Sequence, residues 1–143
     1  MPSTEDEACA ALVRGLAALP PDERDRQAAP VRTAKLTRKV EVFARRMAAL
    51  AVRTGSAERL RDGALALALN GCVARETYMM LSLIHHSAAK LGLDGDAVLR
   101  EAARHATPEG ARKVLEYAAR DGKSIATMGW REIDGPDGFD YGR

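Results

Sequence analysis

Helix-breaking residues divide this sequence into short segments, and they constrain its fold more than any other feature. Proline cannot continue a helix beyond its first turn, and glycine after the last turn supplies a left-handed C-terminal cap. Such signals stand at Pro20-Pro21, Pro30, Gly55, Asn70-Gly71, Gly92 and Thr107-Pro108. Beyond a first helix that is stopped by the two prolines, the pattern predicts helices over about residues 31–54, 57–70, 72–91, 95–106 and 108–120.

The composition supports a helical fold. Alanine supplies much of the hydrophobic content, which is 46% of the chain, whereas aromatic residues make up only 4%. Because alanine loses no side-chain entropy in a helix, this bias favours small, closely packed helices over a β-sandwich. The short connections predict antiparallel neighbours, arranged as an orthogonal bundle or as a short HEAT-like array. We therefore expect a single all-α domain of about six helices over residues 1–143.

Local signals predict where some elements begin and end. Thr4 and Glu7 have the spacing of a capping box, and Asp94 is placed to cap the helix that begins near residue 95. The charged run DERDRQ, residues 22–27, is interpreted as a connector or as a single helical turn. Residues 129–143 contain several of the aromatic side chains, and we expect a short hairpin or an ordered tail packed on the helices.

Two apolar stripes follow helical spacing in the first half of the chain. In the first helix the stripe consists of Cys9, Leu12, Val13 and Leu16. In the helix predicted over 31–54 it consists of Leu36, Val40, Phe43, Met47 and Leu50. The second stripe is too short to predict a coiled coil, but it is a candidate surface for self-association as well as ordinary core.

The charge and the motifs restrict the classes of function. A formal net charge of +2 and a pI of about 8.7 are far from the excess of a dedicated nucleic-acid binder. Cys9 and Cys72 form neither a CxxC pair nor a metal-ligand spacing, and no Gly-rich phosphate loop or GxSxG motif is present. The start is acidic and no apolar run reaches the ~18 residues of a membrane span. We expect a cytoplasmic protein without a membrane partner, and the Ala/Arg richness is typical of high-GC bacterial genomes.

Two of the three histidines, His85 and His86, are adjacent. Consecutive residues of a helix point about 100° apart, whereas two histidines that bind one metal ion from a helix normally stand at i and i+4. The pair therefore does not predict a metal site. We expect His85 in the core, bonded to Tyr78 or to a backbone carbonyl, and His86 facing solvent.

Glu101 and His105 are four residues apart on a predicted helix. A carboxylate and an imidazole at this spacing could bind a metal ion or act as an acid/base pair. The simpler interpretation is a surface pair that stabilises the end of the helix. A small metal-dependent or acid/base enzyme would need these two side chains to converge with Glu76 or His86. We assign no catalytic residue, metal or cofactor.

The helix predicted over 31–54 carries the strongest charge pattern. Its candidate anion- or partner-binding residues are Lys35, Arg38, Lys39, Arg45, Arg46 and Arg53, against the single acid Glu41. Such a face could neutralise phosphates or meet an acidic protein surface. The alternative is a solvated face whose cations pair with acids of the connector or of the first helix. A single-strand binder would add stacking aromatics, and only Phe43 is near.

A resemblance covers about the C-terminal 80 residues. The segment GALALALNGCVARETYMMLSLIHHSAAKLGLD, followed by IATMGWREIDGPDGFDY, resembles small bacterial all-helical proteins without an assigned activity. The resemblance implies a helical fold and supplies no catalytic residues. We favour a non-catalytic protein–protein interaction module, such as an adaptor, an immunity-type binder or a regulator. The alternatives are binding of nucleic acid or of an acidic partner through the basic helix, a small enzyme, and a homo-oligomer.

Overall fold

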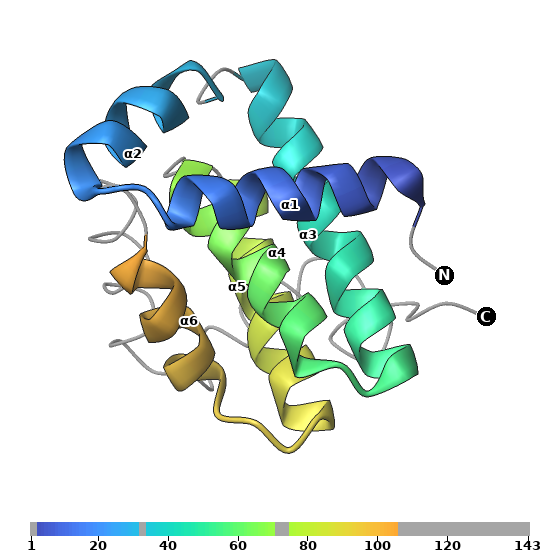
Figure 1. Cartoon of the computed structure of the whole chain (residues 1–143). Helices are drawn as coiled ribbons and strands as arrows, with labels where there is room; N and C mark the ends of the chain where they lie inside the picture. The colour runs from blue at the N-terminus through green and yellow to red at the C-terminus, as the bar shows by residue number, and fades with distance from the viewer. Residues whose placement is uncertain (1–2, 32–33, 71–74, 106–143) are drawn as a thin grey trace.

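The computed structural model describes residues 3–31, 34–70 and 75–105, and Figure 1 shows their arrangement. Within these ranges the chain is all-helical, with six α-helices and no strand, which confirms the predicted all-α fold. The helices are α1 (Thr4–Ala17), α2 (Pro21–Ala28), α3 (Ala34–Thr54), α4 (Ala57–Asn70), α5 (Arg75–Lys90) and α6 (Gly95–Arg104), with a 3₁₀ turn at Ala29–Val31. The helix predicted over 108–120 and the tail at 129–143 lie outside the described residues.

The segment predicted as a connector or a single turn forms the two-turn helix α2 instead. Pro21 occupies the start of this helix, where its fixed φ suits the first turn and its missing N–H is not needed. Asp22 and Glu23 follow in that turn, where carboxylates interact favourably with the helix dipole. The prolines that end α1 therefore also begin the next helix.

The caps agree with the sequence at three ends and differ at one. The N-cap of α1 is Ser3 rather than Thr4, because the Ser3 hydroxyl accepts a hydrogen bond from the Asp6 N–H at 3.0 Å. Gly55 and Gly92 have φ values of 69° and 71°, the left-handed conformation that ends α3 and α5. Asp94 caps α6 as predicted, with its side chain accepting from the Asp96 N–H.

Consecutive helices from α3 to α6 run back along one another, and α1 lies across α3 and α4 (Figure 1). α3 packs on α4 and α5, and α6 packs on α4 and α5 from the other side. α1 thus crosses an antiparallel array that α3 to α6 form (Figure 1). Small residues allow the close approach of α3 and α4, since a Cβ added at Gly63 of α4 would lie 3.3 Å from the Ala44 carbonyl oxygen of α3.

The apolar stripe of α3 is divided between core and surface. Phe43, Met47 and Leu50 are buried, and they pack with residues of α1 and α4 in a second core cluster beside the main one. Leu36 and Val40 are only partly buried. Most of the stripe is therefore ordinary core, and only its N-terminal part is accessible to another molecule.

Ion pairs attach α1 to the other helices. Arg14 donates two hydrogen bonds to the buried Asp62 of α4, from Nε to Oδ1 at 2.9 Å and from Nη2 to Oδ2 at 2.6 Å. The same guanidinium lies 2.9 Å from Glu58. Arg59 of α4 reaches Glu7 at 2.7 Å. Since α1 buries only Ala10, Val13 and Ala17 among its apolar residues, these charged contacts supply much of its orientation.

We predict that Asp62→Ala lowers the free energy of unfolding by about 1–3 kcal/mol, because it removes a charge-assisted, two-bond contact to a buried carboxylate. Glu58→Ala is the matched control, since this carboxylate binds the same guanidinium but is exposed; its effect should stay within about 0.5 kcal/mol. Urea unfolding followed by circular dichroism measures both variants. Equal effects of the two substitutions would contradict the view that the contact with Asp62 holds α1 in place.

Candidate functional site

His85, the first histidine of the adjacent pair, is buried at 9% exposure on α5, as predicted. The Asp96 carboxylate of α6 stands opposite its Nε2 atom, with Oδ1 at 3.1 Å, and the side chain of the expected partner Tyr78 lies outside the described residues. Burial lowers the pKa of His85, and the negative charges of Asp96 and Asp94 oppose this effect. Asp96 also faces Arg100 at 3.9 Å. The imidazole is therefore a packed core group at the α5–α6 contact.

Gly95, the first residue of α6, lies directly against the imidazole. A Cβ added at this position would stand 2.3 Å from His85 Nδ1 and 2.9 Å from His85 Cα. No side chain fits there without moving one of the two helices. The α5–α6 contact thus depends on a glycine that the sequence pattern did not single out.

Among the weak polar candidates, Glu101 and His105 form a surface pair. His105 Nε2 lies 3.6 Å from Glu101 Oε1, and Arg104 approaches the same carboxylate at 3.1 Å. His86 is partly buried rather than fully solvent-facing. The side chain of Glu76 lies outside the described residues. Within the described ranges, no group of three or more His, Cys, Asp or Glu side chains could hold a metal ion.

The basic residues of α3 whose side chains the structure describes are exposed, but they do not form one continuous face. Arg46 lies 3.3 Å from Asp6 of α1, which confirms for this residue the predicted pairing with acids of the first helix. Arg38 and Lys39 border a groove with Arg46, whereas Arg45 and Arg53 are not part of its lining. The side chain of Lys35 lies outside the described residues.

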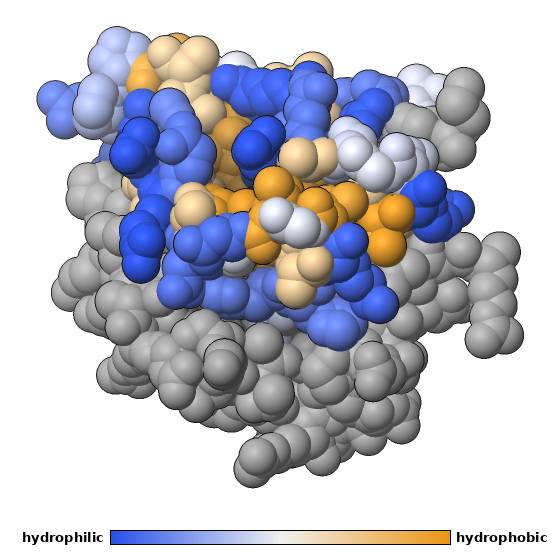
Figure 2. All heavy atoms as spheres, turned by 90° about the horizontal axis from the view of Figure 1, so that it is seen from below, coloured by the Kyte–Doolittle hydropathy of each residue, from blue (hydrophilic) through white to orange (hydrophobic). Residues whose placement is uncertain are grey.

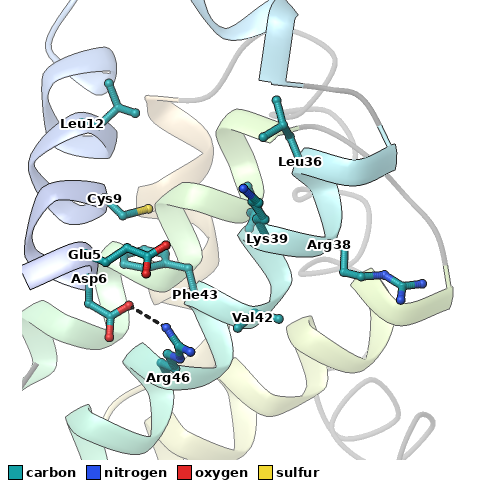
Figure 3. A pocket seen from close by; sticks show the side chains of 11 residues that line it. Glu5, Asp6, Cys9, Leu12, Leu36, Arg38, Lys39, Val42, Phe43 and Arg46 are labelled. Carbon is teal, nitrogen blue, oxygen red and sulfur yellow. Dashed lines mark hydrogen bonds and ion pairs between the residues drawn. The ribbon is translucent and has the colours of Figure 1, made fainter. Parts of the chain in front are cut away.

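The groove between α1 and the first half of α3 is the candidate site (Figure 3). It encloses about 490 Å³ and is open to solvent along one side. Its apolar residues are Cys9 and Leu12 from α1 and Leu36, Val40, Val42 and Phe43 from α3. Leu12 and Val42 are 59% and 41% exposed, and they are the exposed large hydrophobic side chains of the described chain. Apolar surface of this kind beside a hollow marks a binding site more often than scattered single residues do.

Charged side chains rim this groove unevenly. Arg38, Lys39 and Arg46 belong to the α3 side, and Glu5 and Asp6 belong to the α1 side. Figure 3 shows Asp6 and Arg46 reaching toward each other at one end, while Arg38 extends outward from α3. The α3 rim is therefore cationic along its length. The ion pair with a carboxylate of α1, between Asp6 and Arg46, lies at one end of this rim.

Cys9 contributes apolar surface rather than a nucleophile. Its side chain is partly buried, and burial raises the pKa of the thiol, with the negative charges of Asp6 and Glu5 adding to the effect. Because the thiolate is the reactive form, a raised pKa lowers the reactivity of this sulfur at neutral pH. The lining of the groove thus offers a binding surface.

Sequence reasoning missed the groove because it placed Leu12 in one stripe with Val13. Val13 is buried in the core, whereas Leu12 is exposed. The reason is that α1 lies across the other helices and covers them with only a narrow face. The available signal was the width of the apolar stripe. Four apolar residues in α1 are more than its small-residue contact face can cover.

Two other surface features are present. A second hollow of about 430 Å³ lies between α4 and α6, and it is lined by Arg61, Leu93, Asp94, Ala97, Val98 and Glu101. Figure 2 shows, on the face seen from below, an apolar area with hydrophilic side chains beside it. Neither feature combines exposed large apolar side chains with a defined charged rim in the way the α1–α3 groove does.

Comparisons with protein-family models, with curated proteins and with solved structures found no match to this chain. The resemblance proposed for the C-terminal 80 residues therefore stays a prediction. None of the helices in the described ranges combines the length and the hydropathy that a membrane crossing requires.

We predict that stability falls as the pH is lowered through 6.5, because the pKa of His85 lies below this ordinary value in the folded protein. The unfolded chain then binds the proton first, so the free energy of unfolding decreases from pH 6.5 down to the folded-state pKa. Urea unfolding between pH 7.5 and 5.5 measures the slope. His85→Gln should reduce it, whereas His86→Gln should leave it unchanged; an identical slope in all three proteins would contradict the prediction.

We predict opposite effects of alanine at two helical glycines. Gly95→Ala should destabilise the protein by about 1–3 kcal/mol, because the new methyl group overpacks the contact with His85. Gly15→Ala in α1 should stabilise it by about 0.5–1 kcal/mol, because nothing lies within 4 Å of an added Cβ and alanine favours the helix. Thermal and urea unfolding test both, and stabilisation by Gly95→Ala would refute the tight α5–α6 contact.

Proposed function

We propose that this chain is a non-catalytic protein-binding module and that the α1–α3 groove binds its partner. The partner segment brings apolar side chains to the floor of the groove and carboxylates to its cationic rim. The observation that carries this proposal is the exposure of Leu12 and Val42 beside a hollow formed by two helices. Covering such side chains removes apolar area from water at about 25 cal/mol per Å².

The shape of the charge pattern favours a protein over a nucleic acid. The cations of the groove all belong to the α3 side, next to the exposed Val42, so a phosphate backbone that reached them would also cover this side chain without offering it an apolar contact. Arg46 is already engaged by Asp6. A polypeptide segment offers apolar and acidic groups together, which matches both parts of the lining.

Binding rather than catalysis suits the side chains of the groove. Its lining holds carboxylates at one end, cations on the opposite wall and a thiol whose pKa is raised. A nucleophile or a general base needs a pKa tuned toward neutrality and a second group to orient it. Of the two carboxylates of the lining, Asp6 faces the Arg46 cation and not such a group.

We predict that a double variant, Leu12→Asp with Val42→Asp, loses partner capture at least about tenfold, a change of about 1.4 kcal/mol in binding free energy. The tagged full-length chain is used as bait in a nuclease-treated lysate of its source organism, and the partner is then purified for titration. Because both replaced side chains are exposed, the fold should persist, and circular dichroism checks this.

The matched control is Ala8→Asp with Ala11→Asp. Both alanines are exposed on α1 and neither lines the groove, so the control adds the same charge nearby. The control should bind the purified partner as the unmodified chain does. Equal binding by all three baits would refute the proposal. Material that is captured from an untreated lysate but not from the nuclease-treated one would instead support nucleic-acid binding through the basic helix.

A further inference from the structure

We infer that the partner segment is an amphipathic α-helix. Its apolar stripe enters the groove, and it carries carboxylates along the one edge of this stripe that lies beside α3. This inference rests on the proposed function, because it names the class of partner for the same groove. Three features of the groove carry it: the kind of backbone that forms its walls, the spacing of its apolar residues and the asymmetry of its rim.

The walls of the groove favour a helical partner over an extended one. Both walls are α-helices, whose backbone N–H and C=O groups bond within the helix, and the described residues contain no strand. An extended segment laid on Leu12, Val42 and Phe43 would therefore find no backbone partners, and its own amides would lose water against an apolar floor. A helix satisfies its backbone internally and presents only side chains.

The apolar residues of the groove follow the spacing that a third helix requires. On α3, Leu36, Val40 and Phe43 are separated by four and three residues, and on α1, Cys9 and Leu12 are separated by three. Each wall therefore presents apolar side chains along its own helix axis, and Figure 3 shows Cys9 and Leu12 on α1 opposite Leu36 and Phe43 on α3. The valley between two such rows accepts the i, i+3, i+4 and i+7 side chains of a third helix.

The rim specifies charges on the partner. Arg38 and Lys39 lie on the α3 side without a carboxylate among the lining residues drawn near them, whereas Asp6 reaches Arg46 at 3.3 Å. Asp6 thus shows, within the chain itself, how a carboxylate meets this wall. A partner helix that places Asp or Glu beside α3 extends the same pattern toward Lys39 and Arg38. Complementary charge of this kind sets the orientation and speeds association.

The test is a display selection on the immobilised full chain, using random peptides of about 16 residues, roughly four helical turns. Peptides that also bind the Leu12→Asp, Val42→Asp variant are removed by subtraction. The enriched peptides should show apolar residues at helical spacing, with Asp and Glu at one edge, and should become helical on binding. A Pro-rich, extended or basic consensus, or no enrichment above the subtracted variant, would overturn the inference.

Charge reversal supplies the second measurement. The selected peptide and its counterpart with Lys in place of Asp and Glu are titrated by fluorescence anisotropy. The unmodified chain should prefer the acidic peptide at least about tenfold. Arg38→Glu with Lys39→Glu should remove or invert this preference. Arg45→Glu with Arg53→Glu makes the same charge change on α3 outside the lining and should keep it; equal behaviour of the two variants would overturn the inference.

The two proposals fail in different ways. If lysate capture depends on Leu12 and Val42 but the selected peptides are extended or basic, the groove is still a protein-binding site and only the helical, acidic partner is wrong. If capture does not depend on these two residues, the proposed function itself is wrong.

Discussion

The bidentate contact between Arg14 and Asp62 is the constraint on which the groove depends. Asp62 is buried on α4, so its charge needs a partner held in a defined position, and Arg14 is that partner. This contact joins the middle of α4 to the second half of α1. Once this contact fixes the position and rotation of α1, the directions of its other side chains are determined as well. Leu12, two residues before Arg14, is then directed toward α3 and away from the covered face.

The small residues of α1 explain why the groove stays open. Alanine and valine on its contact face pack with α4 and with Phe43, Met47 and Leu50 of α3, but they offer too little apolar surface to reach the N-terminal part of α3 as well. A larger residue at Ala10 or Ala17 would push α1 outward, and a smaller residue at Leu12 would leave little floor. The exposed leucine is therefore a consequence of a helix held mainly by charges, with its apolar residues divided between two directions.

The sequence allowed prediction of those parts of the structure that depend on neighbouring residues. The caps at Gly55, Gly92 and Asp94 each involve residues within a turn or so, and they are confirmed. The start of α2 was missed because Pro21 carries two signals, an end and a beginning, and only the first was recognised. The groove was missed for a different reason. Arg14 and Asp62 are 48 residues apart, and no local pattern states which carboxylate an arginine will meet.

The rim of the groove carries charges of both signs, in a chain whose net charge is only +2. Cations on α3 alone would attract any polyanion, including nucleic acid, with little regard for shape. Glu5 and Asp6 on the facing wall oppose that attraction, and Asp6 holds Arg46 at one end of the groove. A ligand must therefore place carboxylates on one side only and apolar groups between. Specificity then arises as much from the ligands that the α1 carboxylates repel as from those that the α3 cations attract.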